Sequence, residues 1–200
     1  MFVFDNYYSV SELAKTAYSM ALTKVVYPKA TLVRRPFIMR GKPRFVYGEG
    51  FTTGYNCRIE TFGGKEDLEP KLIVGKNFRI GDNVHIAAAE RIEVGDDCLL
   101  ASKIFITDLS HGDYGNGAEA TDPSTPPNDR PLTSSPVKIG NNVWIGESVS
   151  ILGGVTIGDG CIIGANSVVS KSIPDNSIAV GCPARVIKRY DNTTKSWVKA

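Results

Sequence analysis

A six-residue repeat between Ile139 and Pro174 constrains this chain more than any other feature of its sequence. Ile or Val opens each of six consecutive hexads, and Gly follows the opening residue in four of them. A period of six fits neither an amphipathic helix nor a half-exposed strand, which repeat every 3.6 and every two residues. It fits a short strand and a turn repeated around a coil. Because one coil cannot bury its own aliphatic residues, the repeat predicts stacked coils that share one core.

The corners of such coils should lie at the polar pairs within the repeat, such as Asn141-Asn142 and Asp159-Gly160. Asn and Gly tolerate the left-handed backbone conformation that sharp turns require. The same pattern recurs upstream in hexads that open at Val74 and Ile80. After Ile86 the next hexad opens eight residues later, at Val94. We expect a two-residue bulge at one corner to absorb this slip.

The repeat also sets the expected domain organisation. Weak hexads begin near Phe45, so residues 45–190 are expected to form one solenoid domain. A charged, glycine-rich loop at residues 63–71 interrupts it. A longer excursion at residues 112–135 contains four prolines and no hexad. A loop of this length in a compact domain usually has a function, such as covering a substrate or bridging subunits, although a passive excursion is the alternative.

Both ends of the chain are basic and lie outside the expected coils. Residues 1–44 carry eight Lys or Arg against two acidic residues. They should form a helix that Ser9 or Ser11 caps and that ends before Pro28, followed by an extended basic arm. The arm either caps the first coil or makes peripheral contact with an anionic lipid or a phosphate-linked substrate. Residues 191–200 are expected to be a short closing tail, helical in part.

Composition narrows the classes of function. The net charge of +2 provides no strong field to recruit nucleic acid. No stretch approaches eighteen apolar residues, and the N-terminus lacks the basic and apolar regions of a signal peptide. Cys57, Cys98 and Cys161 occupy the fifth place of a hexad, and their spacing matches no zinc pattern. We therefore expect a reduced cytoplasmic protein whose cysteines fill the core and which needs no metal.

The two histidines are the natural acid–base groups at neutral pH. His111 takes an outward place in its hexad where the long excursion leaves the solenoid, which makes it the candidate general base. Asp108 is a candidate to orient its imidazole at the acceptor side of the site. His85 also faces outward, one coil earlier. It can be a surface or interface histidine, an acceptor-binding residue together with Asn83, or the base itself.

The hexads resemble those of the hexapeptide-repeat acetyltransferases, and the resemblance covers roughly residues 45–190. It implies an all-β fold, a parallel β-helix with a left-handed turn that the periodicity alone does not give. It also implies acetyl-coenzyme A (acetyl-CoA) as co-substrate and a homotrimer with active sites between neighbours. In this family the catalytic histidine follows a Thr and precedes a loop, as His111 follows Thr107.

The resemblance assigns the donor half of the site to the later coils. Trp144 matches a tryptophan near the thioester arm, and Arg185 and Lys188 match a basic tail that meets the 3′-phosphate region. The full set of implied coenzyme contacts is Trp144, Gly146, Gly164, Ala165, Ser170, Pro183, Arg185 and Lys188. Two of these are glycines, which permit close approach of the backbone.

The acceptor half departs from the galactoside and maltose branch of the family. That branch holds its sugar with an Asn-Phe-Asn run and a downstream Asp, where this chain has Gly81-Asp82-Asn83 and Ala89. The runs at residues 84–88, 101–103 and 130–132 look closer to acetyltransferases of O-antigen and capsule synthesis. The acceptor is then a sugar hydroxyl of a surface-polysaccharide precursor, which can be lipid-linked.

The sequence therefore predicts an acetyl-CoA-dependent O-acetyltransferase. One alternative is an N-acetyltransferase acting on an amino sugar, since the same base and donor site would serve. Another is a hexapeptide-repeat scaffold that lacks catalysis, which the combination of His111, Trp144 and Arg185 disfavours. A zinc enzyme of the carbonic anhydrase type needs three histidines per site, and this chain has two.

Overall fold

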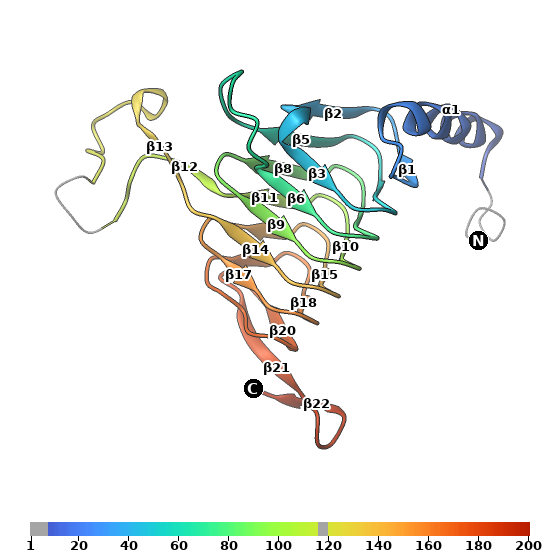
Figure 1. Ribbon diagram of the computed structural model, residues 1–200. Coiled ribbons are helices and arrows are strands. Elements are labelled where there is room, and N and C mark those ends of the chain that lie inside the picture. Colours follow the sequence, from blue (N-terminus) through green and yellow to red (C-terminus); the bar gives the residue numbers. More distant parts are fainter. Residues whose placement is uncertain (1–7, 116–119) are drawn as a thin grey trace.

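The computed structural model describes residues 8–115 and 120–200. Its main body is a three-sided stack of short parallel strands, wound coil upon coil (Figure 1). Each complete coil passes through three sheets, which we name A, B and C in the order in which the chain meets them. The repeat thus forms the solenoid that its period of six predicts.

The strands are short, and each pairs in parallel with the strand one coil away. Sheet A contains β1 (Leu32–Val33), β4 (Thr52–Thr53), β7 (Arg79–Ile80), β10 (Leu99–Leu100), β15 (Trp144–Ile145), β18 (Ile162–Ile163) and β20 (Ser177–Val180). Sheet B contains β2 (Phe37–Arg40), β5 (Cys57–Thr61), β8 (His85–Ala88), β11 (Phe105–Thr107), β16 (Ser150–Ile151) and β19 (Val168–Val169). Sheet C contains β3 (Phe45–Tyr47), β6 (Leu72–Val74), β9 (Ile92–Val94), β14 (Val137–Ile139) and β17 (Thr156–Ile157).

The aliphatic residues that open the hexads form the core. In sheet A, Ile80, Leu100, Ile145 and Ile163 lie in register on successive coils, and each is at most 4% exposed. Burying one such side chain contributes about 1.5–3 kcal/mol. The inward column therefore supplies the main driving force for stacking the coils.

The corners carry the polar pairs, as expected. Asn83 and Asn142 have φ angles of 56° and 55°, in the left-handed region. The side chain of Asn141 accepts the backbone N–H of Asp96 at 2.9 Å, and the N–H of Asn141 is in turn accepted by Asp159 at 2.7 Å. Polar corner residues thus link each coil to its neighbour.

The cysteines fill the core, as their hexad positions predict. The Sγ atoms of Cys57, Cys98 and Cys161 each lie 3.1 Å from a carbonyl oxygen of the adjacent coil and donate to it. Burial raises the pKa of the Cys57 thiol to about 11. These three thiols and the exposed Cys182 are all free.

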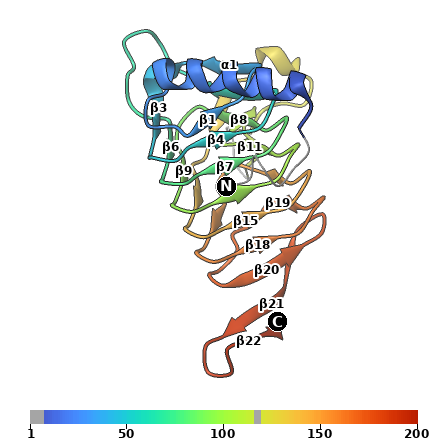
Figure 2. The same ribbon diagram turned by 90° about the vertical axis from the view of Figure 1, so that its right-hand side faces the viewer.

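Helix α1 (Val10–Val26) covers the N-terminal end of the stack (Figure 2). Ser9 is its N-cap, and the Glu12 carboxylate accepts the N–H of Ser9 at 2.8 Å to complete a capping box. The helix is tied to the first coil by polar groups. Thr23 Oγ1 accepts the N–H of Val33 at 2.8 Å, and Ser19 Oγ accepts the N–H of Arg35 at 3.2 Å.

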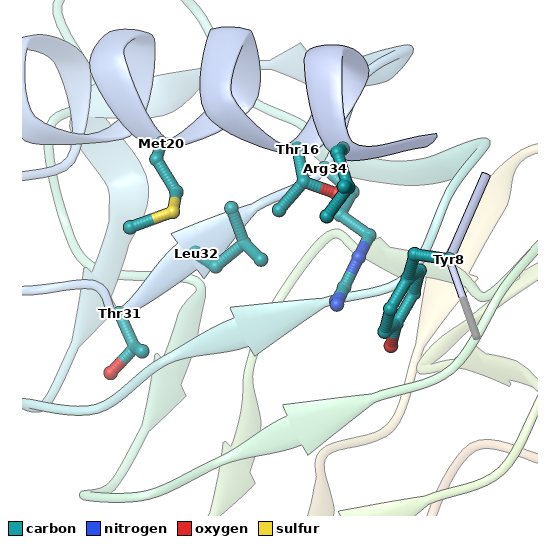
Figure 3. A pocket seen from close by; sticks show the side chains of 7 residues that line it. Tyr8, Thr16, Met20, Thr31, Leu32 and Arg34 are labelled. Atoms are coloured by element: carbon teal, nitrogen blue, oxygen red, sulfur yellow. The ribbon is translucent and has the colours of Figure 1, made fainter. Parts of the chain in front are cut away.

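A cavity of about 160 Å³ lies between α1 and β1 (Figure 3). Leu13 and Met20 of the helix line it, and both remain about half exposed. Its other lining residues are Tyr8, Thr16, Thr31, Leu32 and Arg34. The helix therefore rests on the solenoid without sealing its end completely. None of the helices in the described part of the chain is both long and apolar enough to cross a membrane.

The solenoid begins earlier than the expected boundary at residue 45. Strands β1, β2 and β3 pair in register with β4, β5 and β6, so residues 32–47 already form a coil, in place of an extended arm. The coil lacks the hexad pattern because aromatic rings pack at its centre. The rings of Tyr27 and Phe37 lie 5.8 Å apart, and those of Phe45 and Phe51 lie 5.6 Å apart. The short 3₁₀ helix η1 (Lys42–Arg44) completes this coil.

The C-terminal tail is a β-hairpin, so the expectation of partial helix was wrong. β20 reverses through Gly181, whose φ is 104°, into the antiparallel strand β21 (Arg185–Asp191). β21 then pairs with β22 (Ser196–Lys199), and the rings of Tyr190 and Trp197 lie 5.4 Å apart across this pair. Aromatic cross-strand pairs of this kind stabilise antiparallel ribbons.

Candidate functional site

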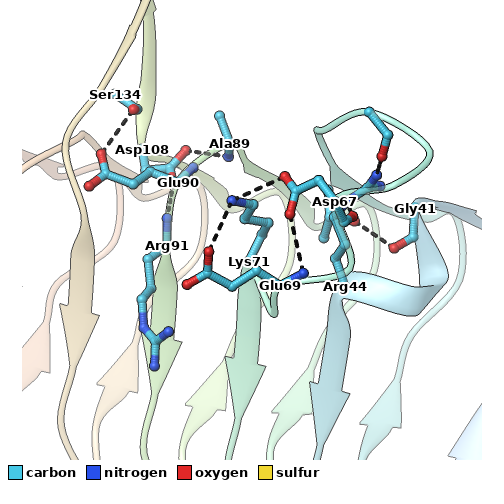
Figure 4. Close-up of polar contacts among 12 residues, drawn as sticks. Gly41, Arg44, Asp67, Glu69, Lys71, Ala89, Glu90, Arg91, Asp108 and Ser134 are labelled. Carbon is cyan, nitrogen blue, oxygen red and sulfur yellow. Dashed lines mark hydrogen bonds and ion pairs between the residues drawn. The ribbon is translucent and has the colours of Figure 1, made fainter.

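Most interruptions of the repeat lie on one edge of the solenoid. Residues 41–44, 62–71, 89–91 and 108–136 each connect a strand of sheet B to the next strand of sheet C. Since successive coils stack in register, these four segments lie one below another along what we call the B–C edge. Figure 4 shows polar contacts along it. The connections at the other two edges stay short, which makes the B–C edge the place where the chain departs from a regular solenoid.

Asp108 is a buried residue whose carboxylate holds the backbone of this edge in place. Its side chain is only 1% exposed, and its carboxylate accepts the backbone N–H groups of Ala89 at 2.7 Å, Glu90 at 2.8 Å and Arg91 at 2.7 Å (Figure 4). Residues 89–91 are the bulge expected between Ile86 and Val94. The sequence makes the Asp108 carboxylate a candidate to orient His111. In the structure this carboxylate is instead hydrogen-bonded to backbone N–H groups.

The backbone of Asp108 also fixes the root of the long excursion. Its carbonyl oxygen accepts the N–H of Ser135 at 2.7 Å, where the returning chain meets the departing one. Between these two residues lies an antiparallel hairpin of β12 (Leu109–His111) and β13 (Leu132–Ser134). The hairpin projects from the B–C edge (Figure 1).

His111 is the last residue of β12, lies opposite Leu132, and is exposed. Gly112 follows it with a φ of 111°, in the region that favours glycine, and a Cβ atom there would lie 2.9 Å from the Tyr114 hydroxyl. That hydroxyl donates to the carbonyl oxygen of His111. The backbone around His111 is thus held by contacts within the excursion.

Arg130 holds the excursion against this backbone. Its guanidinium donates to the Tyr114 hydroxyl at 2.8 Å, to the carbonyl oxygen of Thr125 at 2.8 Å, and to that of Pro123 at 3.2 Å. Arg130 follows the 3₁₀ helix η2 (Pro127–Asp129). The chain of contacts from Arg130 through Tyr114 ends at His111, so this arginine restrains the segment that carries the candidate base.

A polar groove of about 240 Å³ runs beside the root of the hairpin. It is lined by the end of β11, by both strands of the hairpin and by the corner that follows β16: Thr107, Asp108, Leu109, Ser110, Thr133, Ser134, Ser135, Leu152 and Gly153. Its walls carry hydroxyl and backbone groups. The groove can take a small polar ligand next to the strand that presents His111.

His85 is placed quite differently from His111. It lies on β8 of sheet B, where its Nε2 is 2.9 Å from Glu60 Oε2 and its Nδ1 is 3.2 Å from Arg58 Nη2. Because arginine only donates, Nδ1 accepts and Nε2 carries the proton that it donates to Glu60. Burial lowers the pKa of His85, against the opposite effect of its hydrogen bond to Glu60. Both nitrogens of this neutral imidazole are therefore engaged, while His111 is exposed.

The candidate coenzyme contacts lie in the later coils of the stack. Trp144 faces outward from sheet A and is 51% exposed. Its register partners on the strands that follow are Ile162, Ile178 and then Lys188 on β21. The connections from sheet A to sheet B contain three further candidate coenzyme contacts: Gly146, Gly164 and Ala165. A Cβ atom on Gly146 would come within 2.7 Å of the Ala165 nitrogen, so this corner requires glycine.

The remaining sequence candidates are exposed. Ser170 follows β19 at the end of sheet B, and Pro183 and Arg185 lie at the turn between β20 and β21. Asn83 occupies an exposed corner two residues before His85. Among the described residues, no group of three or more His, Cys, Asp or Glu side chains could hold a metal ion.

One chain does not bring all of these residues together. His111 leaves from the B–C edge, whereas Trp144 and Lys188 lie on sheet A. In a three-sided stack the B–C edge is opposite sheet A. The candidate base therefore points in a different direction from Trp144 and Lys188 of the same chain.

Several residues near the candidate base and His85 do not stand out in the hexad pattern. Glu60, Arg58 and Arg40 form a cluster with His85, and Tyr114 and Arg130 secure the excursion. The hexad register places Arg58 and Glu60 two residues apart on one outward face, which is the signal that could have found them. Their pairing with Arg40 depends on a first coil that has no visible hexads.

Comparison with known proteins gives a consistent result. The family model described as bacterial transferase hexapeptide (six repeats) matches residues 136–171. A protein of Escherichia coli K12, WbbJ, named as a candidate lipopolysaccharide biosynthesis O-acetyl transferase, is 39% identical over 193 residues, which is 96% of either chain.

Two solved structures extend this likeness. A maltose O-acetyltransferase from Clostridium difficile 630 superposes with a TM-score of 0.62 at 31% identity, over 92% of this chain and 90% of that one. A galactoside acetyltransferase in complex with coenzyme A gives a TM-score of 0.55 at 32% identity, over 75% of this chain and 70% of that one. The chain therefore belongs to the bacterial hexapeptide-repeat acetyltransferases: it is a left-handed parallel β-helix and an acetyl-CoA-dependent acyltransferase.

Proposed function

We propose that this protein moves an acetyl group from acetyl-CoA to a sugar hydroxyl in surface-polysaccharide synthesis, with His111 as general base. The observation that carries the assignment is the contrast between the two histidines. His111 is exposed on a hairpin that Asp108, Tyr114 and Arg130 hold in place, whereas His85 has both nitrogens engaged.

The chemistry follows from an exposed imidazole on the hairpin whose root lines the groove. A neutral ring nitrogen of His111 accepts the proton of the acceptor hydroxyl as the hydroxyl oxygen attacks the thioester carbonyl carbon. Backbone N–H groups near the thioester stabilise the negative oxygen of the tetrahedral intermediate. The carbon–sulfur bond then breaks, and the protonated imidazole returns its proton to the departing thiolate. The products are an acetyl ester and free coenzyme A.

The choice of a sugar hydroxyl rests on the relatives. The proteins similar to this chain include, by name, a galactoside O-acetyltransferase, a maltose O-acetyltransferase and a candidate lipopolysaccharide O-acetyl transferase. The last of these matches nearly the whole chain, which favours a surface-polysaccharide acceptor. We place the reaction in the cytoplasm, where acetyl-CoA is available.

We further propose that the working unit is a homotrimer. Because the B–C edge and sheet A lie on opposite sides of one chain, a second copy is needed to bring donor contacts to His111. A closed ring of three identical prisms can place the B–C edge of each copy against the sheet A side of the next. In that arrangement Trp144 meets the thioester arm, and Arg185 and Lys188 bind the 3′-phosphate of the coenzyme.

The test is release of free thiol from acetyl-CoA across a panel of sugars that includes lipid-linked repeat units. We expect alkali-labile acetyl esters on the product. His111→Ala should lower turnover by about 10²–10⁴ and leave donor affinity unchanged, because the base acts only as the acceptor proton leaves. Near-normal turnover in this variant would contradict the assignment of the base. Alkali-stable acetyl amides on amino sugars would instead support N-acetylation.

A further inference from the structure

Sheet B carries a charged cluster on its outer face, in the coils above His111. Glu60 of β5 lies at its centre with a side chain that is only 9% exposed. Its Oε1 lies 2.5 Å from Arg40 Nη1, and its Oε2 lies 3.2 Å from Arg58 Nε and 2.9 Å from His85 Nε2. Three neighbouring strands, β2, β5 and β8, thus contribute side chains to one network.

The cluster carries a positive charge that faces solvent. It contains two guanidinium groups, one carboxylate and a neutral imidazole. Burial raises the pKa of Glu60, but its hydrogen bond to His85 and the nearby Arg58 and Arg40 outweigh this effect and lower it, so the carboxylate stays ionised. The side chains of Arg40 and Arg58 remain 69% and 44% exposed. Each arginine has five N–H donors, and only part of them is directed at Glu60 and His85.

The buried carboxylate fixes the two arginines before any ligand arrives. Glu60 holds Arg40 through one oxygen and Arg58 through the other, and His85 accepts a further hydrogen bond from Arg58 at 3.2 Å. An exposed arginine normally loses side-chain entropy when it binds an anion. Here part of that loss has already occurred, which is how pre-organised anion sites gain affinity.

The cluster also lies on the sheet that leads to the candidate base. Glu60, Ala87 and Thr107 are paired in register on successive strands of sheet B. Neighbouring strands are about 4.8 Å apart, so Glu60 lies about 10 Å from Thr107. Thr107 directly precedes Asp108 and the strand that ends in His111. Ala87 lies between the two in the register of the sheet.

We infer that Arg40 and Arg58 bind an acidic group of the acceptor, a carboxylate or a phosphate, while an acceptor hydroxyl is presented to His111. This inference rests on the proposed function and specifies its substrate class. The acceptor is an anionic saccharide or saccharide phosphate that extends from the hairpin root to the cluster. Planar guanidinium groups are well suited to both carboxylates and phosphates, because two N–H donors can meet two oxygens.

The experiment compares matched acceptors on the same enzyme. One pair is a methyl hexoside and the corresponding methyl hexuronide, and the other is a hexose and its 1-phosphate. KM and kcat are measured for the wild type, for Arg40→Gln and for Arg79→Gln. Arg79 is an exposed arginine on sheet A and serves as the control for loss of one positive charge. Arg40 is the more exposed arginine of the cluster, so its substitution should leave the fold intact.

We expect the wild type to prefer the acidic member of at least one pair, and the pair that shows the preference identifies the anion. Arg40→Gln should raise KM for that acceptor about 10-fold, with kcat and the KM of the neutral acceptor unchanged. Raising the salt concentration should raise the KM of the acidic acceptor alone. Arg79→Gln should behave as the wild type.

Equal use of neutral and acidic sugars by the wild type would overturn the inference and leave the proposed function standing. Equal loss for both acceptors in Arg40→Gln, together with a changed mass by light scattering, would make the cluster a contact between subunits. If no sugar is acetylated, the proposed function fails. Calorimetry with methyl glucuronide and inorganic phosphate then decides: binding that Arg40→Gln abolishes supports the anion site, and no binding rejects it.

Discussion

Asp108 is a buried carboxylate that holds the root of the hairpin carrying the candidate base. It accepts three backbone N–H groups from residues 89–91, and its own carbonyl holds Ser135. The Asp108→Asn substitution keeps the shape of the side chain but places an NH₂ group against the backbone N–H donors of residues 89–91. It should lower the free energy of unfolding by about 2 kcal/mol, since a buried amide is left unpaired.

The same variant should lower kcat while leaving donor affinity close to normal, because the root of the hairpin loosens and the later coils are untouched. Chemical denaturation and steady-state kinetics measure the two effects. Asp129→Asn, an exposed position on the same excursion, is the control. A stable Asp108→Asn protein with full turnover would show that this carboxylate positions nothing.

Glu60 and His85 give the stability of the protein a defined pH dependence. The pKa of Glu60 is below its ordinary value of 4.5, so its contribution is present above that value and is lost as pH falls through the folded-state pKa. The pKa of His85 is also lowered, from 6.5, so acid again favours the unfolded chain, which takes up the proton more readily. Stability should therefore decline as pH falls from about 7 toward 4.

Glu60→Gln should unfold at a lower temperature than the wild type at pH 7, and the difference in melting temperature should vanish as the pH falls through the folded-state pKa of Glu60, which lies below 4.5. Glu66→Gln, in the exposed loop before β6, is the control and should follow the wild type throughout. Thermal melts at several pH values make the comparison. A constant difference between wild type and Glu60→Gln across this range would mean that the carboxylate does not titrate as a paired group.

Among the elements, the long excursion depends on Arg130, which makes three hydrogen bonds within its described part. Arg130→Gln should loosen the contact between Tyr114 and the carbonyl oxygen of His111, because Arg130 holds the Tyr114 hydroxyl. We expect faster hydrogen exchange in residues 120–134 and a fall in kcat of about 10-fold, while the melting temperature of the solenoid changes little. Arg79→Gln provides the matched control. Unchanged exchange in Arg130→Gln would show that the excursion is ordered by other means.

The coils could be predicted from the sequence because inward aliphatic residues and left-handed corners are both local signals, as at Ile145 and Asn142. The first coil could not, since the packing of Phe37 and Phe45 replaces the aliphatic pattern. The C-terminal hairpin was missed because the pairing of Tyr190 with Trp197 becomes apparent only after the chain reverses at Gly181.

Only part of the candidate site could be predicted from the sequence, for a related reason. His111 stands out because it lies where the period breaks. The role of Asp108 depends on the backbone of residues 89–91, one coil away, and no residue type signals it. Counting three sides per coil would have shown that residues 63–71 and 112–135 share one edge. The side-chain partners of Glu60 can be identified only from the register of the strands in three dimensions.

In the whole molecule, the three-sided stack places the candidate base and the candidate donor residues Trp144 and Lys188 on opposite sides. The proposed homotrimer resolves this separation, because each B–C edge can face the donor side of a neighbouring copy. Light scattering at micromolar concentration should give three times the mass of the chain, with or without reducing agent, since the cysteines are free. A monomer that is fully active would remove the need for a shared site.

Complementation between two inactive variants tests whether His111 of one copy acts with the donor half of another. One variant is His111→Ala, and the other combines Trp144→Ala, Arg185→Ala and Lys188→Ala. The two are co-expressed with different affinity tags, and mixed trimers are isolated by successive purification on both. In every mixed trimer, about one site in three joins an intact His111 to an intact donor half across a subunit boundary.

Acetyl transfer by the mixed trimers should therefore recover to about a third of the wild-type rate, while each variant alone stays at background. Sites formed within a single chain would leave the mixed trimers inactive, because every chain then carries one damaged half. Recovery supports both His111 as the base and the shared site. Mixed trimers that remain at background would rule out the shared site, and a His111→Ala homotrimer that is active by itself would rule out His111 as the base.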